Sequence, residues 1–416
     1  DPIEDNPRHS GHDYRTNWES TLIASLLQPE VWHYEIMPWP HRIFEKSYPS
    51  TQPVKKDTPR IPMPKEYETE LQAVITAMGD MKQPPEKVQW LSSGTRDVGV
   101  LVSDTMMFQR FGPDSSDGEL GSFYGLALPL LMRGIPVEAV QIETADLAPY
   151  KVLLLTYEGQ KPPNQKLHAA LAKWVNDGGA LIVIDDDKDP FHKVREWWNT
   201  GEYKLDTPRH DLFDVLKVPR DATGLTRVGK GAVVYADKSP AAISHARDGG
   251  DQVRTLTKSA MSAIGVEWKE ANSLVLRRGP YIVAGGLDDP KADAAPVALR
   301  GRFIPLFDAA LPVVSEYVVK PGTRALLVDL DAMPEVGVVA AACRVSDTHV
   351  SSDKIEFTTD GIDQTNGLIC IKVPSAPKSV TIESSAVASD AYEYRDGLLR
   401  IRLNNQPDAR RVTISW

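Results

Sequence analysis

The region from Asp97 to about Asn199 alternates apolar strands with helices, and this alternation constrains the fold more than any other feature. Strands are expected at Val98–Ser103, Val137–Ile142, Lys151–Thr156 and Ala180–Asp185, and helices at Gly121–Arg133 and Gln165–Asn176. Strands that are apolar along their whole length are buried on both faces. Strands that alternate with helices form a parallel sheet covered by those helices. The pattern therefore predicts a flavodoxin-like α/β domain.

The pattern changes after about Trp268, where short alternating strands are separated by turn signals. These signals stand at Arg278-Gly279-Pro280, Lys320-Pro321-Gly322, Asp360-Gly361 and Arg395-Asp396-Gly397. Regularly spaced short strands of this kind predict an antiparallel β-sandwich. The segment between the two regions, Gly201 to Glu267, mixes short helices with a strand at Gly231–Tyr235 and is expected to close the α/β domain.

Two helices are expected before these domains. Tyr14–Leu27 carries apolar residues at helical spacing, with Thr16 or Asn17 as the predicted cap, and Lys65–Met78 carries one apolar stripe. Between them, Pro49–Arg60 is rich in Pro, Ser, Thr and Lys and is expected to be an irregular connector.

Composition excludes some function classes. The 416 residues carry a formal net charge of −10, and Lys and Arg do not gather into a basic face, so we expect no nucleic-acid partner. No apolar run reaches the roughly 18 residues that suggest a membrane span. Because the chain opens with Asp1 and not Met, we expect its true amino terminus and any targeting signal to be absent. Cys343 and Cys370 are the two cysteines, and a disulfide and two buried thiols both stay open.

The first 44 residues hold the strongest candidates for chemistry. Asp1, Glu4 and Asp5 lie on one expected loop, and Glu35 lies in an expected strand. Glycoside hydrolysis needs two carboxyl groups that flank the scissile bond, and an apolar setting raises a carboxyl pKa as a general acid requires. We therefore predict Glu4, Glu35 and Asp1 as catalytic. The expected substrate contacts are Trp39, His33, Asn6 and Trp32.

Structural roles for the same residues stay open. Glu4 and Asp5 are equally suited to capping the helix or pairing with Arg8, and Glu35 to pairing with Arg42 or His33. Trp32 and Tyr34 would then pack against neighbouring helices. The histidines His9, His12, His33 and His41 match no zinc-binding spacing, so no metal and no cofactor is expected.

Several motifs carry a family resemblance. Gly99-Val100-Leu101-Val102-Ser103-Asp104-Thr105, Phe123-Tyr124-Gly125-Leu126-Ala127-Leu128-Pro129-Leu130-Leu131 and Arg133-Gly134-Ile135-Pro136-Val137 resemble the opening of the middle domain in bacterial β-galactosidase-type glycoside hydrolases, and Val228-Gly229-Lys230-Gly231-Ala232-Val233-Val234-Tyr235 resembles its closing strand. That domain is amidotransferase-like and serves trimerisation in the family. The resemblance implies a carbohydrate substrate, a homo-oligomer, and a secreted or periplasmic protein of which this chain is the carboxyl-terminal part.

The implied architecture has four parts. Residues 1–48 would be the end of a (β/α) barrel, 49–96 a linker and helix, 97–267 a class I glutamine amidotransferase-like domain, and 268–416 a β-sandwich. An amidotransferase needs a nucleophilic cysteine, and none stands between Asp97 and Arg254, so this domain is expected to be inactive. The alternative function is a non-catalytic carbohydrate-binding or oligomerisation module.

One acidic run leaves a further alternative. Asp185, Asp186, Asp187 and Asp189 follow an expected strand and could hold a cation such as calcium. The more frequent interpretation of such a run is a solvated strand end. The loop that begins at Ser103 lacks a glycine-rich phosphate cradle, so nucleotide binding is only weakly indicated.

Overall fold

The computed structural model describes residues 10–31, 33, 46–51, 54–81, 87–107, 120–144, 146–288 and 296–416. By internal contacts these residues divide into two compact units. The α/β unit is Ser93–Asn272, and the β-rich unit is formed by the described residues before Ser93 and after Asn272. Each unit has its own hydrophobic cores.

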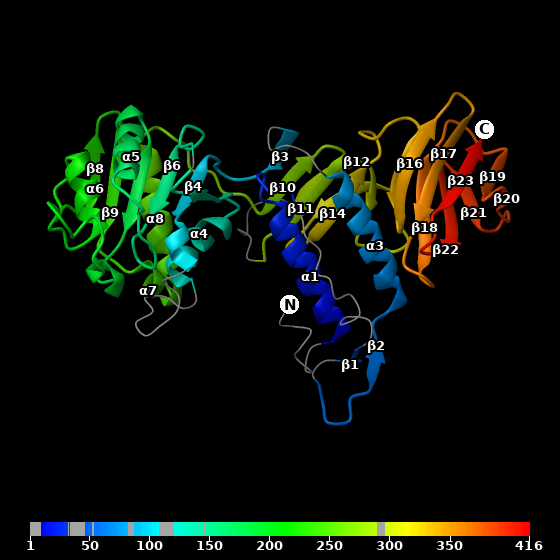
Figure 1. Ribbon diagram of the computed structural model, residues 1–416, viewed down its shortest axis with the longest axis horizontal. Coiled ribbons are helices and arrows are strands. Elements are labelled where there is room, and N and C mark those ends of the chain that lie inside the picture. The colour runs from blue at the N-terminus through cyan, green and yellow to red at the C-terminus, as the bar shows by residue number, and fades with distance from the viewer. Residues whose placement is uncertain are drawn as a thin grey trace. The chain divides into compact units, whose positions relative to one another are not determined.

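A six-stranded sheet forms the centre of the α/β unit and confirms the predicted parallel sheet (Figure 1). Its strands are β4 (Val98–Val102), β5 (Glu138–Gln141), β6 (Val152–Leu155), β7 (Ala180–Ile184), β8 (Gly224–Val228) and β9 (Gly231–Ala236). The order is β5-β4-β6-β7-β9-β8, and all neighbours are parallel except β8, which is antiparallel to β9. The first strand, β4, has neighbours on both sides, so the chain changes direction between β4 and β6.

Helices cover both faces of this sheet. The helices are α4 (Gly121–Leu131), α5 (Lys166–Asp177), α6 (Pro208–Leu216), α7 (Pro240–His245) and α8 (Gly249–Ala263), and a 3-10 helix η2 (Asp104–Met107) follows β4. Residues of α5 and α6 share one core with the sheet, and residues of α4, α7 and α8 share the other. The contact between α4 and α7 is tight, because a Cβ on Gly125 would lie 2.1 Å from the carbonyl oxygen of Pro240.

The β-rich unit contains a six-stranded antiparallel sheet packed against two helices. The strands are β3 (Val88–Ser92), β10 (Ser273–Arg278), β11 (Tyr281–Gly286), β12 (Val297–Pro305), β13 (Val314–Val319) and β14 (Arg324–Asp329), in the order β13-β12-β14-β11-β10-β3. The helices are α1 (Gly11–Leu26) and α3 (Lys65–Asp80), which bury apolar side chains against the sheet. Between the helices, β1 (Ser47–Pro49) pairs with β2 (Arg60–Pro62).

Both predicted helices are confirmed, but the predicted cap of the first is wrong. Ser10, and not Thr16 or Asn17, caps α1: its hydroxyl accepts a hydrogen bond from the Asp13 amide at 3.1 Å, and the Asp13 carboxylate accepts one from the Ser10 amide at 2.7 Å. This reciprocal pair is a capping box, which satisfies amides that a helix start leaves free. Thr16 and Asn17 lie inside the helix.

A two-sheet sandwich is present between Gly337 and Ser415. The predicted bounds of 268–416 are wrong at their start, because the strands from Ser273 to Asp329 pair with β3 in the separate six-stranded sheet. One sheet has the order β15-β18-β22-β21 and the other β16-β17-β23-β19-β20. The strands are β15 (Gly337–Ala341), β16 (Arg344–Val350), β17 (Lys354–Asp360), β18 (Asn366–Lys372), β19 (Ser379–Ile382), β20 (Ser385–Ala386), β21 (Tyr392–Arg395), β22 (Leu398–Asn404) and β23 (Arg410–Ser415). Inward-facing residues of both sheets form one core. Cys343 and Cys370 are buried free thiols.

The fold class as a whole is mixed α/β with several β-sheets. The predicted barrel end stays a prediction, because residues 1–9 and 34–45 lie outside the described part of the chain. Among the described helices, none has the length and hydropathy needed to cross a membrane.

Candidate functional site

Most of the predicted site residues lie outside the described residues. These are the catalytic candidates Asp1, Glu4 and Glu35 and the substrate-contact candidates Asn6, Trp32 and Trp39. His33 is described, and its exposed side chain lines a cavity of the β-rich unit.

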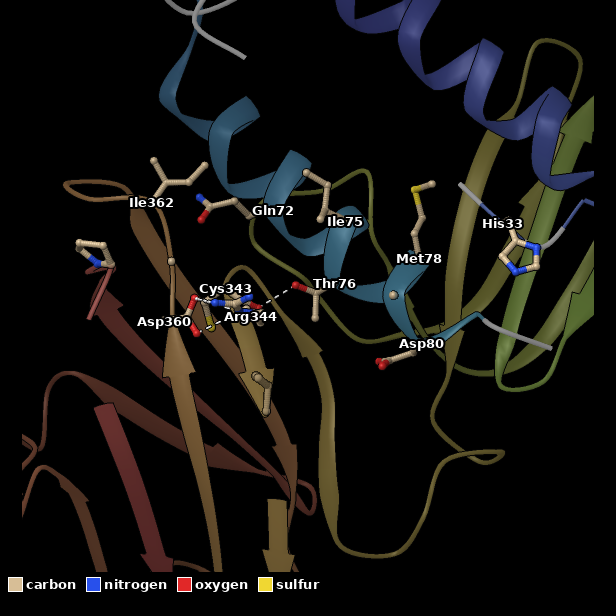
Figure 2. A pocket seen from close by; sticks show the side chains of 14 residues that line it. His33, Gln72, Ile75, Thr76, Met78, Asp80, Cys343, Arg344, Asp360 and Ile362 are labelled. Atoms are coloured by element: carbon tan, nitrogen blue, oxygen red, sulfur yellow. Dashed lines mark hydrogen bonds and ion pairs between the residues drawn. The ribbon is translucent and has the colours of Figure 1, made fainter. Parts of the chain in front are cut away.

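This cavity has a volume of about 810 Å³ and lies between α3 and the edge of the sandwich (Figure 2). Figure 2 shows Gln72, Ile75, Thr76 and Met78 of α3 on one side, and Arg344, Asp360 and Ile362 on the other. The Thr76 hydroxyl donates to the Cys343 carbonyl oxygen at 2.7 Å, and this hydrogen bond holds α3 against the sandwich.

The cavity lining does not suit glycoside hydrolysis. Asp360 accepts from Arg344 Nε at 3.0 Å through both oxygens, so its charge is already paired. Burial raises the pKa of the Cys343 thiol to about 11, which keeps it protonated and weakly nucleophilic. No Trp, Tyr or Phe of the described residues lines the cavity to stack on a sugar ring.

In the α/β unit, ligands of this fold class bind at the carboxyl ends of the strands, where the strand order reverses. Here that point lies between β4 and β6, and the Gln160 side chain fills it. Gln160 Nε2 donates to the carbonyl oxygens of Leu101 at 3.0 Å and Thr156 at 2.9 Å, and Oε1 accepts from the Ser103 amide at 2.7 Å. Gln160 is 2% exposed.

Lys161 lies next to Gln160 at the same carboxyl ends of the strands, which we call the sheet edge. Its buried ammonium donates to the carbonyl oxygens of Tyr157 at 2.6 Å and Gln160 at 3.0 Å, and lies 3.2 Å from Asp189 Oδ1. Burial lowers the pKa of Lys161, and Asp189 opposes this effect. The edge that would hold a cofactor or substrate is thus occupied by the unit's own side chains.

A buried relay lies beside this edge and resembles a catalytic arrangement. The Tyr157 hydroxyl is 2.5 Å from His168 Nε2, and His168 Nδ1 is 2.6 Å from Asp211 Oδ2. Tyr157 and His168 are fully buried, and burial raises the pKa of Tyr157 and lowers that of His168. Because no substrate can reach these atoms, we assign the relay a structural role.

A cluster of two carboxylates, Glu19 of α1 and Glu70 of α3, joins these helices in the β-rich unit. Arg15 lies between Glu19, with Nε 2.9 Å from Oε1, and Glu70, whose carboxylate contacts the Arg15 guanidinium. Arg324 Nε is 3.2 Å from the other oxygen of Glu19. Burial raises the pKa of Glu70 to about 8, although Arg15 acts in the opposite direction. Two partly exposed arginines pair with these two buried carboxylates, so the cluster links α1, α3 and β14.

Among the described residues of the α/β unit, α4 and its C-cap Met132 carry an exposed apolar stripe. Tyr124, Leu128 and Met132 are 42%, 44% and 51% exposed, and their spacing of four places them on one helix face. The helix sequence from Gly121 to Leu131 contains no charged residue. A helix that is apolar on all sides is normally buried, so this face has the character of a contact surface.

No protein-family model and no curated protein matches the chain. Similar solved structures include a β-galactosidase from the haloarchaeon Halorubrum lacusprofundi, with 16% identity and a TM-score of 0.31 over 60% of this chain and 42% of that chain. An α-L-fucosidase isoenzyme 2 from Paenibacillus thiaminolyticus has 11% identity and a TM-score of 0.26 over 78% and 49%. An exo-carrageenase from Bacteroides ovatus has 11% identity and a TM-score of 0.20 over 77% and 29%.

TM-scores of 0.20 to 0.31 are too low for these similarities to support a conclusion about the fold or function of this chain. The chain spans less than half the length of each, between 29% and 49%. We therefore argue function from the residues of this chain alone.

Proposed function

We propose that the chain is the carboxyl-terminal part of a glycoside hydrolase that acts on oligo- or polysaccharides. Its catalytic carboxylates are among Asp1, Glu4 and Glu35, and Trp39 stacks on the sugar. The α/β unit performs no chemistry at its sheet edge and serves assembly. The sequence motifs and the carboxylates of the first 44 residues support the hydrolase.

One observation supports assigning catalysis and assembly to different parts of the chain: side chains of the α/β unit fill the carboxyl ends of its strands. Gln160 and Lys161 occupy the position where this fold class binds ligands. Three carboxylates of the described sites are also engaged: Asp360 by Arg344, Asp189 by Lys161 and Asp211 by His168. A glycosidase needs two carboxyl groups facing a cleft, which leaves the amino-terminal carboxylates as the best candidates.

The assembly role rests on the α4 stripe, whose partner we propose to be a second copy of the same chain. Replacing Leu128 by Glu places a charge in the centre of the stripe, at a side chain that is 44% exposed and so is not needed for the unit's own core. The variant should shift an oligomer toward monomer in light scattering at micromolar concentration.

Val215→Glu is the matched control, because Val215 lies on α6 of the same unit and is 42% exposed. It should leave the oligomer unchanged. A wild-type protein that is a monomer throughout the concentration series would refute the assembly role without affecting the hydrolase proposal.

The hydrolase proposal has its own test, which is turnover of a panel of aryl glycosides and polysaccharides by the natural full-length protein. Release of reducing sugar from at least one substrate is expected. A protein that binds sugars and cleaves none would favour the alternative function of a non-catalytic carbohydrate-binding module.

A further inference from the structure

Three side chains that can bind a metal gather just after β7. They are Asp185, Asp187 and His192, and one ligand atom from each lies within 4.8 Å of the others. Asp185 is 0% and His192 3% exposed, whereas the Asp187 side chain is 25% exposed. The expectation of a solvated strand end is therefore wrong for Asp185. Asp185 and His192 are thus the buried part of the cluster, and Asp187 forms its rim, which solvent can reach.

The charge of Asp185 lacks a cationic partner. Its carboxylate accepts hydrogen bonds from the amides of Tyr157 at 2.6 Å and Asp187 at 2.8 Å, and from the Thr156 hydroxyl at 3.2 Å. No Lys or Arg of the described residues lies within ion-pair distance of it, and its nearest basic atom is His192 Nε2 at 3.9 Å. Buried charges in proteins are paired or bind metals.

His192 supplies a second and independent indication. Both of its ring nitrogens are buried, and neither has a hydrogen-bond partner among the described residues. Its position is nevertheless fixed, because its carbonyl oxygen accepts from Trp198 Nε1 at 2.9 Å and from Asn199 Nδ2 at 3.0 Å. A buried polar group left without a partner destabilises the folded state, so a ligand that binds the ring nitrogen would remove this cost.

The two buried groups lie slightly farther apart than two ligands of one ion. The 3.9 Å between His192 Nε2 and Asp185 Oδ1 is too long for a hydrogen bond. Zinc is tetrahedral and lies about 2.0–2.2 Å from imidazole nitrogens and carboxylate oxygens, which places two of its ligand atoms about 3.3–3.6 Å apart. The two side chains therefore need to approach each other by about 0.5 Å to contact one ion. Asp187, which is partly exposed, is paired with Arg209 through both of its oxygens, and a carboxylate in such a pair keeps further lone pairs with which it can complete the set.

We propose that Asp185, Asp187 and His192 bind one divalent first-row transition ion of the zinc type. The imidazole decides the class of ion, because calcium and magnesium prefer oxygen ligands, whereas imidazole suits zinc and its neighbours. The neighbouring groups already orient the ligands: Arg209 Nε donates to Asp187 Oδ1 at 2.8 Å, and the Tyr157 amide holds Asp185. Because all three ligands follow β7, the bound ion would fix His192 to the carboxyl end of that strand.

The test is a titration of the tag-free, chelator-stripped chain with Co²⁺, followed by displacement with Zn²⁺. One Co²⁺ per chain should give visible d–d absorption, and Zn²⁺ should remove it. His192→Phe fills the same space without a ligand nitrogen and should abolish the signal. His245→Phe, an exposed histidine at the end of α7, is the matched control and should bind Co²⁺ like the wild type.

Asp187→Asn is the second variant. It keeps the shape of a partly exposed residue and an amide oxygen that can still accept from Arg209, so it is expected to fold if His192→Phe does not. Its affinity should fall by at least about tenfold. A wild-type chain that binds neither Co²⁺ nor Zn²⁺ would overturn the proposal, as would binding of Ca²⁺ in preference to Zn²⁺. Unchanged affinity in folded His192→Phe, or in Asp187→Asn, would also overturn it.

Discussion

Replacement of Lys161 by Met tests whether the closed edge of the α/β sheet is a structural feature. The side chain is 4% exposed, and its ammonium contacts two carbonyl oxygens and Asp189. Removing one partner of a buried ion pair usually costs about 3–5 kcal/mol. Asp189 keeps hydrogen bonds from the amides of Gly159 at 2.6 Å and Phe191 at 2.8 Å. We therefore expect the lower end of that range, about 3 kcal/mol.

Two effects compete in this estimate. Burial lowers the pKa of Lys161, so the ammonium itself costs free energy to bury. If that cost dominated, methionine would be neutral or stabilising, as can happen when a buried pair is replaced by apolar groups. Because Met leaves the Asp189 carboxylate buried without its cation, we expect destabilisation, and the double variant Lys161→Met with Asp189→Asn should recover part of it.

The assay is hydrogen exchange of the β6 and β7 amides, measured by mass spectrometry on the whole chain. A loss of about 3 kcal/mol speeds exchange through unfolding of the unit by roughly 100-fold. Amides of β18 in the β-rich unit serve as an internal reference. Lys173→Met is the matched control, since its pair with Asp177 is exposed and should contribute little. Exchange in Lys161→Met within about threefold of wild type would refute the reasoning.

Three further predictions concern the buried groups. Burial raises the folded-state pKa of Glu70 to about 8, above its unfolded value, so between these pKa values the folded β-rich unit binds a proton that the unfolded chain has lost. The free energy of unfolding should therefore fall as pH rises from about 4.5 to 8. Glu70→Gln should flatten this pH dependence in urea titrations. A wild-type slope that is flat or rising would contradict it. Asp211→Asn should destabilise the α/β unit by about 1–3 kcal/mol in thermal unfolding and leave turnover per folded molecule unchanged; lost turnover would make the relay functional. Because burial raises the pKa of both thiols to about 11, Cys343 and Cys370 should resist iodoacetamide at pH 8 until the chain is unfolded, and rapid labelling of the native chain would show otherwise.

The α/β unit was predictable because its signals are local. Its strands are continuously apolar, as in Val152–Leu155 and Ala180–Ile184, and the observed bounds lie within one or two residues of the expected ones. Helix α5 likewise begins one residue after its predicted start. Patterns of this kind depend on neighbours in sequence, so a single chain reveals them.

Features that depend on distant partners were missed. The sequence predicts a linker and helix for the segment that contains strand β3. The sequence of β3 alone gives only a weak strand signal, and its pairing partner β10 follows about 180 residues later. The capping box of α1 was missed for a different reason. Ser10 precedes Gly11 and His12, which are poor signals of a helix start, so the apolar spacing from Tyr14 onward suggested a later cap.

The site chemistry was the least predictable part. His168 and Asp211 are 43 residues apart in sequence, and only the packing of α5 beside α6 brings them together. His192 stands in no recognisable motif, whereas the acidic run next to it is recognisable in the sequence. Burial decides the role of such groups, and burial of a single polar residue cannot be read from its immediate neighbours.

The most direct measurement for the proposed function is turnover per folded molecule of three amide variants in the natural full-length protein: Asp1→Asn, Glu4→Gln and Glu35→Gln. Replacing a general acid or base by its amide keeps the shape and removes the proton or the charge, so at least one variant should lose about 10²- to 10⁴-fold in rate while its melting temperature stays unchanged. Glu30→Gln, at an exposed residue just after α1, is the control and should keep the wild-type rate. If all three variants retain near-normal turnover on the natural substrate, the catalytic pair lies elsewhere and the assignment is wrong.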